Sequence, residues 1–373
     1  MNIIYLDNAA TTRAADEVQH EMTWANNELF YNSAALYGAS LNVKKAIEQA
    51  NKTIKAKVDK SGGGELVFTS GATESNNMVI FGKITHTRQH MLVLSGEHSS
   101  VYAPSVYLKN QGYDVDYVPL LNDGRIDMEA LKSLVRPNTA LFVFGMVNSD
   151  TGTMQNASDI VKTIRVKNPK VHIHCDAVQA FCKFGFDAGA LGFDSVSLSA
   201  HKINGPKGIG ALWIKKGVTI KPIMYGGSQQ DYRPGTENNT AIIGFAKAVE
   251  VFNTEENFEK INALHARLIY NLPDGCRING NNINPYITNI QLPNILGSTI
   301  MNALSSRGIC IGLGSACSAN SAKNRTLLAM NIPEQKTKQV IRVSLGVYNT
   351  QSDIDTFLNA IKESIAKYYL NNN

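Results

Sequence analysis

The sequence predicts an α/β protein whose main domain holds a largely parallel sheet with helices on both faces. From about residue 64, short apolar runs alternate with helical stretches, which is the pattern of repeated strand-helix units. The runs are nearly continuous in apolar residues, as expected for strands covered on both faces. The chain has 373 residues, of which 43% are apolar and 18% are charged, so it is long and apolar enough for two cores.

Seven apolar runs are expected to form the strands of this sheet. In chain order they are ELVFTS (65–70), HMLVLS (90–95), DVDYVPL (114–120), TALFVFGMV (139–147), KVHIHCDA (170–177), DSVSLSA (194–200) and GIGALWI (208–214). Helices are expected between several of them, including SNNMVIFGKITHTR (75–88) and MEALKSLV (128–135).

A second, smaller α+β unit is expected towards the end of the chain. A helical run from about 239 to 270 precedes it. The unit itself is expected to comprise YITNIQL (286–292), GICIGLG (308–314), QVIRVSLG (339–346) and a final helix.

Charge and targeting signals argue against nucleic-acid and membrane partners. The formal net charge is +5, and its densest cluster, residues 44–60, has the pattern of the solvated face of an amphipathic helix. An acidic or nucleic-acid partner is the less favoured alternative for this cluster. No run approaches the roughly 18 apolar residues of a membrane span, and Asp7 interrupts any signal-peptide core. We therefore expect a cytoplasmic protein.

The cysteines and histidines favour neither disulfides nor a metal. The five cysteines lack CxxC spacing. In HIHC (172–175), strand alternation places His172 and His174 on one face and Cys175 on the other, so the sequence predicts no metal site there.

The ends of the expected strands carry the polar groups of interest, because ligands of open α/β sheets bind beyond the carboxyl ends of the strands. After ELVFTS, a turn at Gly71 leads into a helix start at Ala72 and Thr73. Free N–H groups there, with the Thr73 hydroxyl, would bind a phosphate. A simple helix cap by Ser70 or Thr73 explains the same residues equally well.

Two further strand ends add a carboxylate and an amine. Asp176 ends one run with Gln179 following, and it could cap the next helix or face a cationic ring nitrogen. Ser199 and His201 could donate hydrogen bonds to a phosphate, while Lys202 offers a primary amine. A lone lysine is usually a solvated surface residue. The combination has one economical explanation, a pyridoxal phosphate held by Lys202 as a Schiff base, with Asp176 keeping the pyridine nitrogen protonated.

Ordered motifs along essentially the whole chain then become recognisable. They are YLDNAATT (5–12), TSGATESNN (69–77), EH (97–98), MVNSDTG (146–152), HCDAVQ (174–179), SLSAHKINGPKGIGAL (197–212), RPGTEN (233–238), GSACS (314–318) and IRVSLG (341–346). Through them the chain resembles the class V aminotransferase family, and within it the cysteine desulfurases of the NifS/IscS type, which are pyridoxal phosphate enzymes of fold type I.

The resemblance implies an architecture and a set of cofactor contacts. A large cofactor-binding domain with a mostly parallel seven-stranded sheet would span residues 13–255, and residues 1–12 and 256–373 would form a small α+β domain that carries the catalytic cysteine loop. Cofactor phosphate would be bound by Ala72, Thr73, Ser199 and His201, and by Thr236 from the other subunit of a homodimer. The pyridine ring would be bound by His98 through stacking, by Asn148 and Gln179 near O3′, and by Asp176 at its nitrogen.

The resemblance also implies the chemistry. Arg342, with Asn148, would hold the carboxylate of L-cysteine, a task that suits a guanidinium fork, although a structural salt bridge is the alternative for Arg342. Lys202 would move the Cα proton, and His98 is a candidate acid/base for the substrate thiol. Cys317, in a small polar segment, would attack the substrate sulfur, so that alanine leaves and a persulfide is carried to an acceptor protein. Outside the family context, a structural role is the favoured interpretation of Cys317.

Some positions depart from the family pattern. Tyr37 stands where a histidine is common, and Ser149 and Asp150 stand where Asn-Glu is usual. These changes put the identity of the sulfur acceptor in doubt, and an iron–sulfur scaffold, a tRNA-thiolation protein or a cofactor-biosynthesis enzyme are all open. The competing functions are an aminotransferase, against which Cys317 argues, a selenocysteine lyase, and a cofactor-binding assembly partner without turnover.

Overall fold

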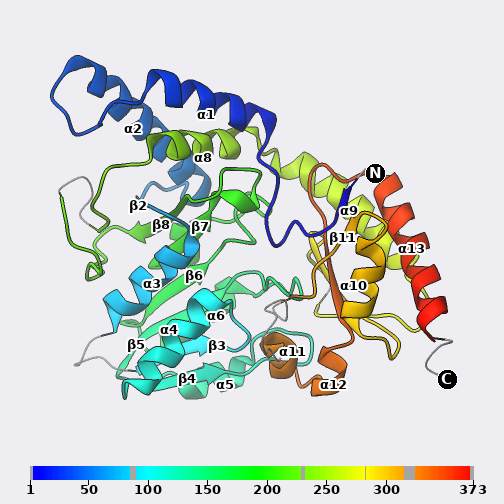
Figure 1. Cartoon of the computed structure of the whole chain (residues 1–373). Coiled ribbons are helices and arrows are strands. Elements are labelled where there is room, and N and C mark those ends of the chain that lie inside the picture. Colours follow the sequence, from blue (N-terminus) through cyan, green and yellow to red (C-terminus); the bar gives the residue numbers. More distant parts are fainter. Residues whose placement is uncertain (1–2, 85–89, 228–231, 282, 315–323, 370–373) are drawn as a thin grey trace.

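The computed structural model describes residues 3–84, 90–227, 232–281, 283–314 and 324–369. A seven-stranded sheet with its helices occupies one side of Figure 1, and two smaller sheets with helices α9 (Thr254–Tyr270), α10 (Gly297–Ser305) and α13 (Gln351–Tyr369) occupy the other. The α/β class predicted from the alternating runs is confirmed. The domain boundaries at residues 13 and 255 stay a prediction.

The large sheet contains every one of the seven expected strands. They are β2 (Gly64–Thr69), β3 (His90–Leu94), β4 (Val115–Val118), β5 (Thr139–Gly145), β6 (His172–Asp176), β7 (Ser195–Ser199) and β8 (Gly210–Lys215). Their order across the sheet is β2-β8-β7-β6-β5-β3-β4. Pairing is parallel from β7 to β4, while β8 runs antiparallel to both of its neighbours. The expected mostly parallel sheet is therefore confirmed.

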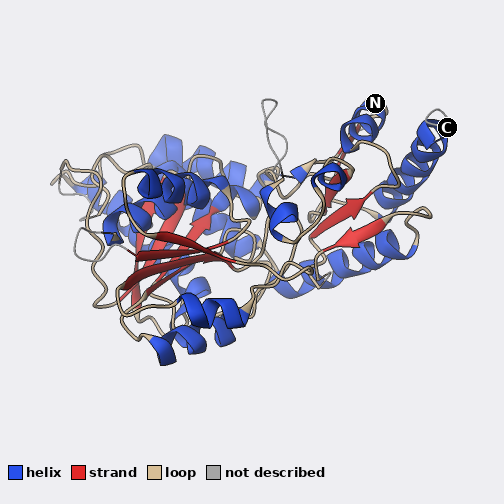
Figure 2. Cartoon of the chain, turned by 90° about the horizontal axis from the view of Figure 1, so that it is seen from below, coloured by secondary structure: helices blue, strands red, loops and turns tan. Residues whose placement is uncertain are grey.

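Helices cover both faces of this sheet, as Figure 2 shows from below. The helices of this part of the chain are α1 (Asp16–Glu28), α2 (Gly38–Val58), α3 (Ala72–Lys83), α4 (Ser99–Asn110), α5 (Met128–Leu134), α6 (Ala157–Lys167), α7 (Ala188–Leu191), the short η1 (Ala200–Lys202) and α8 (Asn239–Val251). The basic cluster lies in α2, whose buried positions recur with helical spacing, as the amphipathic pattern predicted. Helix α8 packs against both α1 and α2.

The helical run expected at 239–270 is two helices rather than one. Helix α8 ends at Val251 and α9 begins at Thr254. Asn253 causes the break, because its side chain accepts a hydrogen bond from the Glu256 N–H and so caps a new helix. An asparagine between two apolar helical stretches is a capping signal that periodicity alone does not detect.

The smaller sheets bring the two ends of the chain together. The remaining elements are β1 (Ile4–Tyr5), β9 (Arg277–Asn279), β10 (Ile287–Gln291), β11 (Ile309–Cys310), α11 (Arg325–Ala329), α12 (Glu334–Thr337) and β12 (Val340–Ser344). Strand β1 pairs in parallel with β11, and β10 pairs antiparallel with both β12 and β9. The apolar run at 308–314 forms only a two-residue strand. Beyond it, the backbone of Gly312 forms an isolated antiparallel β-bridge with Arg342 instead of continuing the strand.

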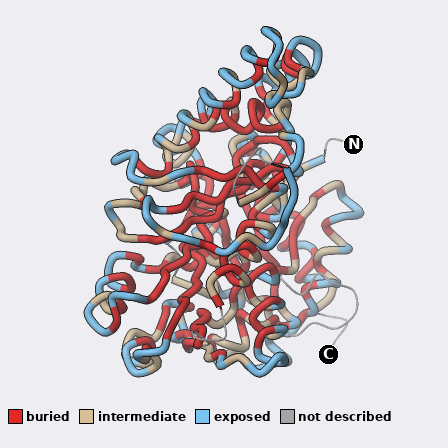
Figure 3. The backbone as a smooth tube through the Cα atoms, turned by 90° about the vertical axis from the view of Figure 1, so that its left-hand side faces the viewer, coloured by how far each residue is buried: buried red, intermediate tan, exposed pale blue. Residues whose placement is uncertain are grey.

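Buried segments run through the interior, and exposed ones lie in turns and on outer helix faces, as Figure 3 shows. The central strands β3, β5, β6 and β7 are buried along their whole length. None of the helices formed by the described residues combines the length and the apolar character that crossing a membrane requires.

Candidate active site

A cavity of about 890 Å³ lies where the parallel strands of the large sheet end. Segments that follow β3 (96–100) and β5 (147–150) line it, together with the last residue of β6 and the last residue of β7. The loop after β1 and strand β12 close it from the smaller sheets. A volume of this size accommodates a cofactor-sized ligand.

The cavity brings together most of the residues predicted from sequence. Those that line it are Ala72, Thr73, His98, Asn148, Asp176, Gln179, Ser199, His201, Lys202 and Arg342. Thr236 is exposed and does not line the cavity of this chain. Cys317 lies outside the described residues, which stop at Gly314 and resume at Asn324.

One end of the cavity is built around the start of α3. Gly71 precedes the helix with φ 156° and ψ 173°, a conformation essentially restricted to glycine. No side chain caps the helix here, so the N–H groups of Ala72 and Thr73 are available to a ligand. The alternative explanation, a cap by Ser70 or Thr73, is therefore wrong. An uncapped helix start of this kind favours an anion.

A hydrogen-bond network with a buried centre at Asn76 holds Asp176 and the exposed His98. Asp176 Oδ1 accepts a hydrogen bond from the Val178 N–H at 3.0 Å, and Oδ2 accepts one from Asn76 Nδ2 at 2.8 Å. Asn76 Nδ2 also donates to Ser100 Oγ at 2.8 Å, and the Ser100 N–H donates to His98 Nδ1 at 3.2 Å. Because Nδ1 accepts, a neutral His98 ring carries its proton on Nε2.

The same network explains the two histidines of HIHC. His172 Nε2 and His174 Nδ1 both lie 2.7 Å from Ser195 Oγ, so they share a face as strand alternation predicted. His174 Nε2 donates to Asn76 Oδ1 at 2.9 Å. Burial lowers the pKa of His174 to about 3, so its ring is neutral and serves to fix the Asn76 amide.

Lys202 extends from η1, directly after β7. Its Nζ donates to the carbonyl oxygens of Ala9 and Ala10, each at 2.6 Å. Burial, followed by the charge of Arg342, lowers the pKa of Lys202 to about 8. An appreciable fraction of the amine is therefore uncharged near neutral pH and able to act as a nucleophile or base. The surface interpretation of this lysine is wrong.

His201 precedes Lys202 and is held by the loop after β1. His201 Nδ1 lies 3.1 Å from Thr11 Oγ1. Burial, together with the charges of Lys202 and Lys207, lowers the pKa of His201 to about 4. A neutral imidazole at this position can donate a hydrogen bond to an anion without carrying a full charge.

Arg342 projects from β12 and is already engaged in ion pairs. One guanidinium nitrogen lies 2.8 Å from Asp7 Oδ1, and the other lies 3.8 Å from Asp150 Oδ1 and donates to the Ser149 carbonyl at 2.9 Å. The structural salt bridge that sequence analysis raised as the alternative is therefore present. Its Nε has no hydrogen-bond partner among the described residues although it is buried.

Asn148 and Gln179 both use their side chains within the protein. Asn148 Nδ2 donates to the Gly96 carbonyl at 3.2 Å, while Oδ1 accepts from the N–H groups of the two residues that follow Ser149. Gln179 Nε2 donates to the Ala9 carbonyl at 3.0 Å, and Gln179 Oε1 accepts from Lys183 Nζ at 2.9 Å. Each amide keeps an N–H that can face a ligand.

Sequence reasoning missed three polar residues, Asn76, Glu97 and Lys183. Glu97 lines the cavity, and its Oε1 accepts from the Gly145 N–H at 2.7 Å. Burial raises the pKa of Glu97 to about 8, so this carboxyl is largely protonated at neutral pH. Asn76 and Glu97 lie inside the motifs TSGATESNN and EH, and this membership is the one signal that the sequence offers for them.

Described residues on either side of the segment that contains Cys317 line the cavity. Gly314, the last described residue before it, and Arg325, the second after it, both line the cavity. The Arg325 guanidinium stacks 4.3 Å from the ring centroid of Tyr102.

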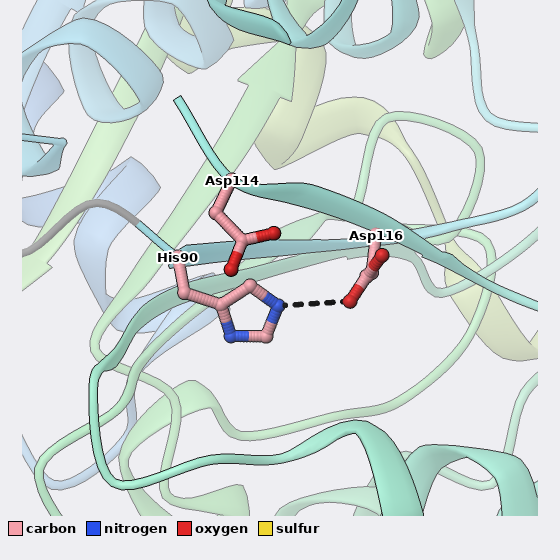
Figure 4. A group of neighbouring side chains, drawn as sticks. All are labelled: His90, Asp114 and Asp116. Carbon is pink, nitrogen blue, oxygen red and sulfur yellow. Dashed lines mark ion pairs between the residues drawn. The ribbon is translucent and has the colours of Figure 1, made fainter. Parts of the chain in front are cut away.

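A second polar cluster lies at the opposite, amino-terminal ends of the strands. His90, Asp114 and Asp116 place ligand atoms within 4.8 Å of one another (Figure 4). Arg136 forms ion pairs with both carboxylates, and His90 Nδ1 lies 2.7 Å from Thr139 Oγ1. Because the Arg136 guanidinium pairs with both carboxylates and offsets part of their charge, we interpret this cluster as an ion-pair network that joins β3, β4 and β5.

Comparison with known proteins places this geometry in a family. The model of the class-V aminotransferase family matches residues 4–357. A cysteine desulfurase IscS 1 of Archaeoglobus fulgidus is 33% identical, with 96% of this chain and 95% of that protein covered. Among solved structures, a NifS-like protein superposes with a TM-score of 0.91 at 32% identity, over 98% of this chain and all of that one.

A further solved structure, SspA in complex with cysteine, has a TM-score of 0.81 at 31% identity and covers 93% of this chain and 99% of its own. The matches extend across both the large sheet and the smaller sheets, so they include all the segments that meet at the cavity. The chain therefore belongs to the class-V aminotransferase family, within its group of NifS- and IscS-like cysteine desulfurases.

Proposed function

We propose that this chain is a pyridoxal phosphate-dependent cysteine desulfurase, which converts L-cysteine to L-alanine and retains the sulfur as a persulfide on Cys317. The observation that carries the proposal is the position of Lys202. Its amine, with a pKa of about 8, lies in a cavity that also holds an uncapped helix start and a buried carboxylate. Relatives over the whole chain bear the name cysteine desulfurase, and one solved relative is a complex with cysteine.

The residues of the cavity fit the cofactor at each of its functional groups. The N–H groups of Ala72 and Thr73, with Ser199 and His201, would hold the phosphate. Asp176, fixed by two donors, would pair with the pyridine nitrogen, and the His98 ring would stack on the pyridine. When bound, pyridoxal phosphate supplies an electron sink for the carbon next to the substrate carboxylate.

The chain's own residues then supply positioning and proton transfer. Arg342, with Asn148, would bind the substrate carboxylate. To do so, its guanidinium would give up part of its ion pairing with Asp7 and Asp150. Lys202 Nζ would accept and return the Cα proton, for which its lowered pKa suits it. His98 Nε2 would exchange a proton with the substrate thiol.

Cys317 would accept the sulfur in a balanced exchange. The substrate C–S bond breaks and an S–S bond forms on Cys317, so that L-cysteine and the enzyme thiol give L-alanine and the enzyme persulfide without an external oxidant. Support for this role comes from the chain on either side of Cys317, since Gly314 and Arg325 line the cavity. A thiol carried on a connecting segment can also meet an acceptor outside the cavity.

We further propose that the active form is a homodimer. Apolar side chains are exposed near the loop between α1 and α2, where Leu36 is fully exposed and Phe30 is 66% exposed, and Tyr225 is 79% exposed. The loop between α1 and α2 and the segment between β8 and α8, which contains Tyr225, both lie on the left side of Figure 1. Exposed apolar surface of this kind favours association with a second copy, and it would let Thr236 reach the cavity of the neighbour.

The acceptor of the sulfur is proposed to be a protein of iron–sulfur cluster assembly or of tRNA or cofactor thiolation, and the location to be cytoplasmic. We propose that the chain contacts neither nucleic acid nor a membrane directly. Affinity capture of the persulfide-loaded protein followed by mass spectrometry would identify the acceptor, with the Cys317→Ser variant as the control for contacts that do not depend on sulfur.

Incubation of the purified protein with L-cysteine and a reductant tests the proposal directly. We expect sulfide and alanine in equal amounts, and loss of both in Lys202→Ala. Keto acid formation with an amino acceptor, in place of alanine and sulfide, would instead show an aminotransferase. The same assay with selenocysteine as substrate identifies a selenocysteine lyase. Such an enzyme would release selenide from selenocysteine but little sulfide from L-cysteine.

A further inference from the structure

Lys183 is a buried amine next to the cavity that none of the roles above uses. It is only 5% exposed, and the described residues place no carboxylate within ion-pair distance of its Nζ. Burial, followed by the charge of Lys202, lowers the pKa of Lys183 to about 7. Lysines are almost never buried without a partner, because removing the amine from water is costly.

Lys183 belongs to a continuous chain of hydrogen bonds that ends at Lys202. Lys183 Nζ donates to Gln179 Oε1 at 2.9 Å, and Gln179 Nε2 donates to the Ala9 carbonyl at 3.0 Å. That carbonyl also accepts from Lys202 Nζ at 2.6 Å. The link runs from the turn after β6, through the loop after β1, to the amine in the cavity.

This arrangement determines which end of the Gln179 amide faces which partner. The two ends of an amide have nearly the same shape, so only hydrogen bonding decides its orientation. The amine of Lys183 has N–H groups to donate in either protonation state, which directs Oε1 toward it. The Ala9 carbonyl can only accept, which directs Nε2 toward it. The second Nε2 hydrogen has no acceptor among the described residues, and Gln179 lines the cavity.

The backbone of the turn supports a constrained role. Cys182, directly before Lys183, has a φ of 60°, which is uncommon for a residue other than glycine. Such a conformation persists only where the surroundings hold it. The Lys183 amine also lies 5.5 Å from the centroid of the Tyr286 ring, so its position is defined from the smaller sheets as well.

We propose that Lys183 is a positioning residue that fixes the Gln179 amide, so that Gln179 presents an N–H donor to an oxygen of the bound cofactor. The inference rests on the proposed function, since the ligand it concerns is pyridoxal phosphate. Without Lys183, Oε1 loses its donor in a buried place, and the amide is free to turn its oxygen toward the cavity. An N–H donor is then replaced by a carbonyl that repels an anionic oxygen.

The test is a double-mutant cycle read by cofactor binding to the apo-protein, in equilibrium dialysis with pyridoxal phosphate. Lys183→Met removes the donor with little change in volume, and we expect it to weaken binding about tenfold, as for a lost hydrogen bond to a charged acceptor. In a Gln179→Met background the same change should weaken binding less than about twofold, because the amide it positions is gone. Lys183→Gln, which keeps an N–H donor, should restore most of the affinity and covers the case in which Lys183→Met does not fold.

Two controls separate positioning from other effects of removing a lysine. Lys207→Met removes an exposed cavity-lining charge, and its effect should add to that of Gln179→Met without coupling. The absorption spectrum of the bound cofactor should shift in Lys183→Met but not in Lys183→Gln. An equal loss of affinity from Lys183→Met in both backgrounds, or no loss at all, would overturn the inference. Failure of the wild-type protein to bind pyridoxal phosphate would overturn the proposed function, and this inference with it.

Discussion

Replacement of Asn76 by alanine should destabilise the fold and disrupt the buried network behind the cavity. Asn76 is fully buried, and its amide serves three partners, namely Asp176, Ser100 and His174. Alanine would leave Asp176 Oδ2 without its donor and His174 Nε2 with only the 3.1 Å contact to Ser197 Oγ.

The magnitude follows from these lost partners. A buried polar group left without its hydrogen bond costs about 1–3 kcal/mol, and the change leaves Asp176 Oδ2 in that state, removes one of the two contacts of His174 Nε2 and creates a small cavity. We therefore expect a loss of roughly 2–5 kcal/mol in the free energy of unfolding. The neighbouring Asn77 gives a matched control, since it is only half-buried and its Nδ2 donates to the Thr73 carbonyl at 2.8 Å in a solvent-exposed hydrogen bond. Asn77→Ala should cost less than about 0.5 kcal/mol.

Urea unfolding of the apo-protein at pH 7, followed by circular dichroism and by tryptophan fluorescence, measures both variants under one set of conditions. Coincidence of the two signals establishes that a single free energy can be compared. A stability of Asn76→Ala within about 0.5 kcal/mol of that of Asn77→Ala would refute the account of the network.

Three further predictions concern Glu97, Lys202 and Thr236. Burial raises the pKa of Glu97 to about 8 in the folded chain. The protonated carboxyl therefore makes its full contribution to the free energy of unfolding below its ordinary pKa, and this contribution falls by about 1.4 kcal/mol per pH unit as the pH rises to about 8. In urea titrations between pH 5 and 8, Glu97→Gln should lack this loss, and parallel pH profiles would contradict the assignment. Lys202→Ala should lose the borohydride-reducible attachment of cofactor found by peptide mass spectrometry, and an attachment at another lysine would refute its role. Mixed Lys202→Ala and Thr236→Asp protomers should regain desulfurase activity as heterodimers, whereas a fully active monomer in sedimentation would exclude shared sites.

The strands and the cavity could be predicted because each depends on a local pattern. Buried parallel strands require continuous apolar runs, so β3, β5, β6 and β7 were visible in the sequence. Their carboxyl ends meet at one edge of the sheet, which explains why Asp176 and Lys202 could be assigned to one site although 26 positions separate them.

Residues that act through other residues could not be predicted in this way. Asn76 and Lys183 matter because of partners that only the folded chain brings near, such as Asp176 from β6 and Gln179 from the same turn. A lysine within an apolar run gives no sign of whether its amine is solvated or buried. The break between α8 and α9 was missed for a related reason, since a single capping side chain outweighs the periodicity of its surroundings.

Intact-mass measurement of the persulfide tests the central claim most directly, because Cys317 separates desulfuration from every other reaction of this family's cofactor. After exposure to L-cysteine without reductant, the wild-type protein should gain one sulfur atom, about 32 Da, which peptide mapping places on Cys317. Cys317→Ser should show no such gain and should form little alanine, while it still binds L-cysteine and still shifts the cofactor's absorption. A serine hydroxyl at neutral pH has neither the ionised fraction nor the affinity for sulfur to replace the thiolate. A mass gain and normal alanine production that both persist in Cys317→Ser would contradict the account.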